Sequence, residues 1–259
     1  MRNRHRVSIG GVGFDPLGDA EFAVHVCAAL AAGVGGWATV PTLDVVARAM
    51  RDPAVRSGLA SADLVLASGT PLWLAARLAG ARLPAPDAST FIWAVLAAAR
   101  SAGRSVYLLG GEPEIPGRRE GAHRAASVVS FACPGVTIVG HASPRPDADG
   151  DSGELAAICA EIGDVAPDVV VVGLDVARQA WVAARLRRAL PGTWFIGWPA
   201  AIRTMTDVPE RTRGRVPPVG LTARLCRGAL AERRSEPAGV DPSVLGEQPQ
   251  HCARGVSDG

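Results

Sequence analysis

The chain has 259 residues, of which 48% are hydrophobic and 20% are charged, and its formal net charge is +2. Such a composition can bury a large core, which excludes a disordered body, and the near-neutral charge argues against a general nucleic-acid binder. All 27 positively charged residues are arginine, which excludes a P-loop lysine and any catalytic lysine.

The first half of the chain alternates segments of helical character with short apolar segments that are typical of buried strands. Asp19 to Ala32 carries apolar residues on a helical face and is followed by Gly33, a common C-terminal stop. Pro53 suits the first turn of another helix. The expected helices cover 19–32, 43–50, 53–60, 70–78 and 89–102, and the expected strands cover 37–40, 64–67 and 105–109.

The second half continues the same alternation. Asp168 to Gly173 is the clearest buried strand, because its valines are β-branched on both faces. The expected helices cover 116–129, 154–162 and 176–190, the other expected strands cover 136–139 and 194–197, and a polar loop is expected at 143–153.

This order of elements predicts an α/β fold with a mostly parallel sheet and helices on both faces. In such folds ligands bind beyond the carboxyl ends of the strands, so the turns of interest are 39–44, 68–71, 110–113 and 173–179. The segment 22–43 carries no formal charge and is long enough to span a membrane. Its glycines and Pro41 favour a helix and a strand of the α/β core instead.

The composition changes after residue 205, which predicts three parts: a core over 1–205, an arginine-rich appendage over 206–236 and a disordered tail over 237–259. Between Arg203 and Arg234 there are eight arginines against three acidic residues. This charge run could clamp a diphosphate, lie on an anionic membrane surface, or form only a solvated helix.

The cysteines and histidines predict no disulfide framework and no metal site. The five cysteines are widely spaced without a C-x-x-C pair, which fits a reducing compartment, and the five histidines lack metal-ligand spacing. Asp147, Asp149 and Asp151 imitate a calcium loop or a D-x-D motif. The glutamate that closes an EF-hand loop is missing, so a solvated loop is the better interpretation.

Gly110 and Gly111 follow a strong strand and precede a helix, so their backbone N–H groups could approach a phosphate at the helix N-terminus. An ordinary tight turn is the alternative, and the pattern is not G-x-G-x-x-G. Ser68 and Gly69 lack the G-x-S-x-G context of a serine hydrolase.

Taken in order, several segments resemble the WecG/TagA/CpsF glycosyltransferases, glycosyltransferase family 26. The resemblance runs from about residue 10 to about residue 237, and the segments that carry it are GVGFDPL at 11–17, WATVPTLD at 37–44, RDPAVR at 51–56, ADLVLASGTPL at 62–72, LLGGEP at 108–113, PDVVVVGL at 167–174 and Arg178-Gln179 with Trp181.

The resemblance implies a Rossmann-like core with a C-terminal helical appendage. It implies an activity that moves an N-acetylmannosamine-type sugar from a UDP-sugar to a polyprenyl-linked or other glycan acceptor, without a metal or cofactor, at the cytoplasmic face of the membrane. The implied substrate-binding residues are Thr39, Thr42, Gly69, Gly110, Gly111, Gly173, Arg178, Gln179, Arg224 and Arg227. The C-terminal arginines would contact the diphosphate and the membrane surface. The sequence does not distinguish a monomer from a homo-oligomer.

The chain departs from the family pattern at its catalytic position, where Ser68 replaces an aspartate that is the proposed general base. Thr42 also replaces an asparagine. A serine hydroxyl cannot take up a proton at neutral pH, so Asp44 is the candidate for a replacement base. The alternative is a paralogue that binds a nucleotide sugar or a partner transferase without turnover. Another α/β enzyme, such as a methyltransferase, is disfavoured because a glycine-rich first turn is missing.

Overall fold

The computed structural model describes residues 6–67, 69–78, 83–84, 88–145 and 153–207. The predicted site residues Ser68, Arg224 and Arg227 lie outside these ranges. So do the acidic loop residues 147–151, the tail and nearly all of the appendage, and the proposed boundaries of the appendage and tail therefore stay predictions.

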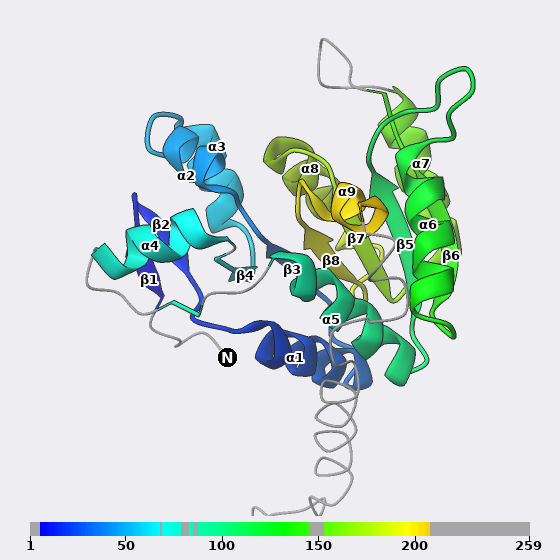
Figure 1. Cartoon of the computed structure of the whole chain (residues 1–259), viewed down its shortest axis with the longest axis horizontal. Helices are drawn as coiled ribbons and strands as arrows, with labels where there is room; N and C mark the ends of the chain where they lie inside the picture. Colours follow the sequence, from blue (N-terminus) through cyan, green and yellow to red (C-terminus); the bar gives the residue numbers. More distant parts are fainter. Residues whose placement is uncertain (1–5, 68, 79–82, 85–87, 146–152, 208–259) are drawn as a thin grey trace, which may run out of the picture.

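The core is a six-stranded sheet whose paired strands are all parallel (Figure 1). Its order is β4 (Leu64–Val65), β3 (Gly36–Thr39), β8 (Trp194–Gly197), β7 (Val169–Gly173), β5 (Ser105–Gly110) and β6 (Thr137–Ala142). Parallel strands need crossover connections, and every crossover between consecutive strands of this sheet contains at least one helix. The predicted α/β fold with a Rossmann-like parallel sheet is therefore confirmed.

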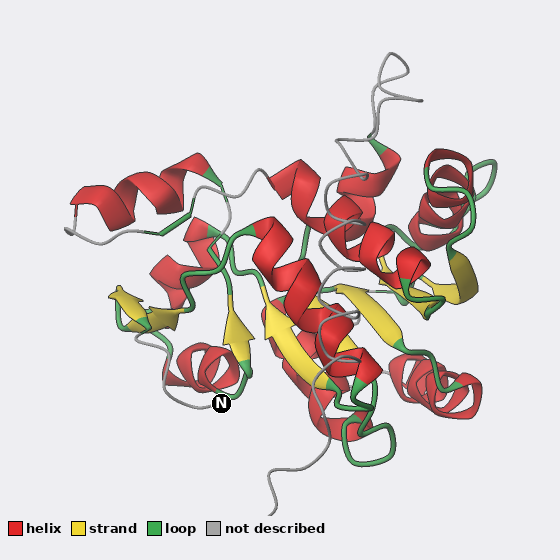
Figure 2. Ribbon diagram, turned by 90° about the horizontal axis from the view of Figure 1, so that it is seen from below, coloured by secondary structure: helices red, strands yellow, loops and turns green. Residues whose placement is uncertain are grey.

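Helices cover both faces of the sheet (Figure 2). Val169 and Val171 face one apolar core, whereas Val170 and Val172 face the other, as the period of two in a strand requires. The first core is closed by α1 (Asp19–Ala31), α5 (Ala88–Ser101), α6 (Gly121–Ala132) and α9 (Ala201–Thr206). The second is closed by α2 (Leu43–Ala49), α3 (Pro53–Ala60), α4 (Thr70–Leu78), α7 (Gly153–Val165) and α8 (Val176–Leu186).

A small hairpin that the sequence analysis did not predict precedes α1. Strands β1 (Val7–Ile9) and β2 (Val12–Phe14) pair antiparallel around Gly10 and Gly11, whose φ angles are 58° and 78°. Two consecutive glycines permit this left-handed two-residue turn. The hairpin leads to Asp15, whose backbone N–H donates to the carbonyl of Val65 at 2.7 Å and whose carboxylate accepts from the Val65 N–H at 2.8 Å.

Several other elements differ from the expectations: for example, β6 runs to Ala142 rather than 139, and α8 ends at Leu186 rather than 190. The helix expected over 116–129 begins at Gly121, because Ile115 and Arg118 exchange two backbone hydrogen bonds around Pro116 and Gly117, which has a φ of 81°. A short helix that was not expected, α9, follows β8. The uncharged segment 22–43 forms most of α1 and all of β3. None of the helices in the described ranges has the length and apolar character needed to span a bilayer.

Candidate functional site

The carboxyl edge of the sheet gathers most of the residues that the sequence analysis selected. Thr39, Gly110 and Gly173 end β3, β5 and β7. Thr42, Asp44, Gly69, Gly111, Arg178 and Gln179 lie in the turns and first helical residues that follow the strands at this edge. Because all six strands are parallel, these segments meet at one side of the molecule, where α/β proteins bind their ligands.

Thr39 and Gln179 form the buried polar centre of this edge. The Thr39 hydroxyl donates to Gln179 Oε1 at 3.0 Å, and Gln179 Nε2 donates to the carbonyl of Leu174 at 2.7 Å. The two side chains are 0% and 1% exposed. Gly197 at the end of β8 leaves the space that the Gln179 amide occupies, since a Cβ there would overlap Oε1. The hydrogen bond thus joins the end of β3 to α8, the helix that follows β7, across the intervening strand β8.

Arg178 is held by the first turn of its own helix. Asp175 caps α8 by accepting from the Arg178 backbone N–H at 3.1 Å, and its other carboxylate oxygen pairs with the Arg178 guanidinium. Burial alone would raise the pKa of Asp175, but the hydrogen bonds and the charge of Arg178 outweigh it and hold this pKa below its usual value. Asp175 is therefore ionised at neutral pH and holds the Arg178 side chain at the carboxyl edge of the sheet.

Thr42 and Asp44 occupy the start of α2. Thr42 is the N-cap residue, and its side chain makes no capping hydrogen bond. Asp44 lies in the first turn with an exposed side chain, a position where the helix dipole favours a carboxylate. The structure therefore places a solvent-accessible carboxylate at the carboxyl edge, five residues beyond Thr39.

The glycine turn after β5 packs against protein rather than leaving an empty cradle. Gly110 and Gly111 have φ angles of 120° and 88°, which exclude most side chains. A Cβ on Gly111 would meet Ile202 Cγ2 at 2.6 Å, and a Cβ on Gly173 would meet Ile202 Cγ1 at 2.6 Å. Ile202 of α9 thus seals the inner side of this turn, while Gly111 itself stays exposed.

The first backbone N–H groups of α6 already have hydrogen-bond acceptors within the protein. The backbone N–H of Gly121 donates to the carbonyl of Glu112 at 2.7 Å, and that of Ala122 donates to Ser143 Oγ at 2.9 Å. Ser143 Oγ in turn donates to the carbonyl of Gly110 at 2.7 Å. The first two helical amides are therefore not free for an anion. Ser143 was not predicted as a site residue, because it stands at the start of the expected polar loop 143–153 and directly follows a strand only in the structure.

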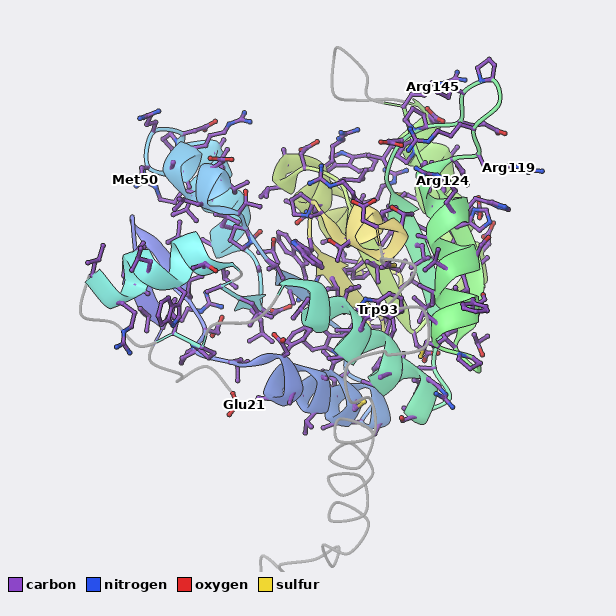
Figure 3. All side chains as sticks on the ribbon, viewed as in Figure 1. Glu21, Met50, Trp93, Arg119, Arg124 and Arg145 are labelled. Carbon is purple, nitrogen blue, oxygen red and sulfur yellow. The ribbon has the colours of Figure 1, made fainter. Side chains whose placement is uncertain are left out.

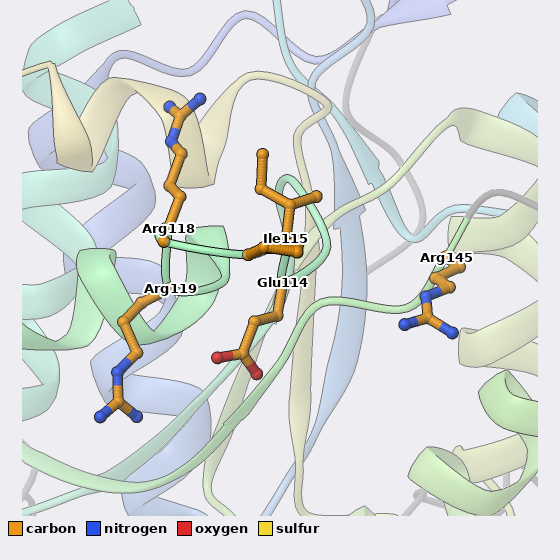
Figure 4. Close-up of a pocket in the computed structure, with 7 residues that line it drawn as sticks. Glu114, Ile115, Arg118, Arg119 and Arg145 are labelled. Carbon is orange, nitrogen blue, oxygen red and sulfur yellow. The ribbon is translucent and has the colours of Figure 1, made fainter.

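An open hollow of about 530 Å³ lies beside this turn (Figure 4). Its lining comes from the loop after β5 and from one residue beyond β6: Glu114, Ile115, Pro116, Gly117, Arg118, Arg119 and Arg145. Arg119, Arg124 and Arg145 lie at the same corner of the molecule, far from Met50 (Figure 3). Three of the seven residues that line the hollow are arginines.

The aspartates that flank the strands have structural roles. Asp63 accepts from the Trp37 backbone N–H at 2.8 Å and pairs with Arg187 at 2.6 Å. Asp168 binds Ser105 and Arg104. In the described ranges no three histidine, cysteine, aspartate or glutamate side chains lie close enough together to hold a metal ion.

Comparison with known proteins gives one family. The family model described as "Glycosyl transferase WecG/TagA/CpsF family" matches residues 7–232. No curated protein matches the chain significantly. The match spans the hairpin, the whole sheet and every helix of the core. The chain therefore belongs to the WecG/TagA/CpsF family of glycosyltransferases.

Proposed function

We propose that the protein transfers an N-acetylhexosamine-type sugar, similar to N-acetylmannosamine, from a UDP-sugar to a lipid-linked or other glycan acceptor without a metal ion. Family membership supports the reaction class. The observation that carries the location is the Thr39–Gln179 hydrogen bond, which holds two polar side chains from distant parts of the chain at the carboxyl edge. Ligands of open α/β sheets bind at this carboxyl edge.

Each predicted site residue has a role in this proposal. Thr39 and Gln179, which are buried, hold the end of β3 and the start of α8 in place beneath the sugar, and Thr42, Gly69 and Arg178 border it. Gly110, Gly111 and Gly173 let the ends of β5 and β7 pack closely against each other and against Ile202, and the exposed side of Gly111 faces the substrate. Arg224 and Arg227 would neutralise the diphosphate leaving group as its bond to the sugar breaks. The reaction would take place at the inner face of the cell membrane, with the arginine-rich segment against the lipid.

Asp44 is the proposed general base in place of Ser68. An acceptor hydroxyl attacks the anomeric carbon, the bond from that carbon to the phosphate oxygen breaks, and UDP leaves with the electron pair. Asp44 takes the acceptor proton. Its exposed carboxylate at the start of α2 can receive a proton, whereas a serine hydroxyl cannot.

UDP release from UDP-N-acetylhexosamines, with a chelator present, tests this function. We expect Asp44→Asn to lower turnover about 10²–10⁴-fold, the usual effect of losing a general base. Asp164→Asn is the matched control, because Asp164 is also exposed but ends α7 at the opposite edge of the sheet. Unchanged turnover in Asp44→Asn would remove Asp44 from the mechanism, and a gain in Ser68→Asp would show that the family position still reaches the substrate.

A binding paralogue predicts a different outcome of the same experiment. The replacement of the family's aspartate by Ser68 is the observation that favours it. Saturable UDP-sugar binding without UDP release, for every donor and acceptor tried and also in Ser68→Asp, would establish binding without transfer. UDP release that depends on an added acceptor would establish the transferase.

A further inference from the structure

The loop that forms the basic hollow has a fixed shape. The Ile115 N–H donates to the Arg118 carbonyl at 3.2 Å, and the Arg118 N–H donates to the Ile115 carbonyl at 2.9 Å. Pro116 and the positive φ of Gly117 suit the two central positions of this turn. The other end of the loop is tied down by the hydrogen bond between Gly121 and Glu112. The backbone therefore holds Arg118 and Arg119 at defined places beside the end of β5.

The residues that line the hollow carry an excess of positive charge. Its lining has three guanidinium groups and one carboxylate, that of Glu114. Arg118 shares the carboxylate of Glu112 with Arg124, each at 2.8 Å, so one acid serves two bases. Arg119 and Arg145 form no ion pair with any described residue. Their exposed side chains lie on two sides of the turn (Figure 4), and the Arg145 backbone N–H donates to the Glu154 carboxylate at 3.1 Å.

The neighbouring backbone cannot serve an anion in the usual way. The first two amides of α6 already donate to Glu112 and Ser143, and Ile202 fills the inner side of the glycine turn. A diphosphate at this corner would therefore be held by guanidinium groups and not by these two amides. Guanidinium pairs bidentately with phosphate oxygens, and a hollow of about 530 Å³ is large enough for a diphosphate with an attached group.

We propose that this hollow binds the diphosphate of a substrate, with Arg119 and Arg145 as its main contacts. The inference rests on the proposed function, in which both the nucleotide donor and a prenyl-linked acceptor carry a diphosphate. Ile115, half exposed at 53%, and Pro116 supply an apolar surface beside it that suits either a base or isoprenyl carbons. The two sources share one chemistry and are separated by experiment.

Isothermal titration at low ionic strength tests the proposal with three probes: UDP, geranyl diphosphate and inorganic pyrophosphate. We expect the Arg119→Gln/Arg145→Gln double variant to bind at least one of the first two, and pyrophosphate, about tenfold or more weakly than the wild type. Arg188→Gln is the matched control, since Arg188 is exposed just beyond α8 at the amino edge. Glu114→Gln should tighten binding, because it removes the negative charge of the lining.

The outcomes distinguish the donor diphosphate from the acceptor diphosphate, and they test this proposal separately from the proposed function. Weaker UDP binding alone assigns the hollow to the donor, and weaker geranyl diphosphate binding alone assigns it to the acceptor. Equal binding by the wild type and the double variant, or no binding of any probe by the wild type, overturns the proposal. Circular dichroism checks that the double variant is folded. These titrations measure binding and need no turnover, so they can be interpreted even if the protein transfers no sugar.

Discussion

At the scale of single residues, the site depends on a glycine that no catalytic argument would select. Gly197 ends β8 where the Gln179 amide turns towards Thr39, and a side chain at this position would take the place of the Gln179 oxygen. Interiors are packed as densely as organic crystals, so even one methyl group has to displace a neighbour. The neighbour here is the buried amide that links β3 to α8.

Gly197→Ala tests this packing. We expect the free energy of unfolding in urea to fall by about 1–3 kcal/mol, the usual cost of overpacking a core. UDP release should fall with it, because the Gln179 amide would move. Gly163→Ala is the control: nothing lies within 4 Å of its added methyl, and alanine is favoured inside α7. An alanine at Gly197 that leaves both stability and Gln179 unaffected would contradict this role.

At the scale of elements, a carboxylate ties the amino ends of β5 and β7 together. Asp168 accepts from the backbone N–H and the hydroxyl of Ser105, each at 2.8 Å, and pairs with Arg104 at 3.1 Å. Burial alone would raise the pKa of Asp168, but the hydrogen bonds from Ser105 and the charge of Arg104 outweigh it and lower this pKa. The ionised carboxylate therefore stabilises the folded sheet.

This linkage predicts a dependence of stability on pH. A lowered pKa in the folded state gives a stabilisation that is present above the usual aspartate pKa and is lost as the pH falls through the lowered value. Between neutral pH and about pH 3, the wild type should lose more unfolding free energy than Asp168→Asn. Urea titrations at several pH values measure the difference, with Asp164→Asn as the exposed control. Parallel curves for the wild type and Asp168→Asn would contradict the prediction.

The alternation of helices and strands could be predicted because each element carries its own periodicity. Val169–Gly173 is an example, since its valines mark a strand covered on both faces. The start of α6 could not be predicted in the same way. Its acceptor, Ser143, follows the next strand along the chain and reaches Ala122 only after β5 and β6 have paired. The hairpin was not predicted because each of its strands has only three residues, too few to show a periodicity.

The site could be predicted only in part for a similar reason. The resemblance selected Thr39 and Gln179, but their hydrogen bond spans 140 positions and exists because β8 lies between β3 and β7. That strand order cannot be derived from local patterns. The arginines of the hollow gave no sequence motif, since Arg118 and Arg119 are separated from Arg145 by a helix and a strand.

At the scale of the whole molecule, the two faces of the sheet each enclose a buried thiol, Cys133 on one side and Cys159 on the other. Burial raises the pKa of Cys159 to about 11, partly offset by Arg185, and burial also raises the pKa of Cys133 against the opposing effect of Arg100. Thiolate is the reactive form of cysteine. Both residues should therefore report on whether the cores are closed.

Alkylation with iodoacetamide at mildly alkaline pH, read by mass spectrometry, tests this expectation. Cys133 and Cys159 should stay unmodified in the native protein and react once urea unfolds both cores, because unfolding removes the burial that raises their pKa values. The unfolded sample is the internal control for reagent and detection. Rapid labelling of Cys159 in the native protein would show that the layer formed by α7 opens easily.

The position of β8 has a consequence for how the chain folds while the ribosome synthesises it. Of the strands in the described residues it is synthesised last, yet it joins β3 and β4 to β7, β5 and β6. At about 5–20 residues per second, the nascent β3–β4 pair waits on the order of 10 s for the strand that completes it. Until then the two parts of the sheet expose unpaired backbone N–H and C=O groups. A chain truncated before Trp194 would therefore contain two half-sheets that lack the strand which joins them.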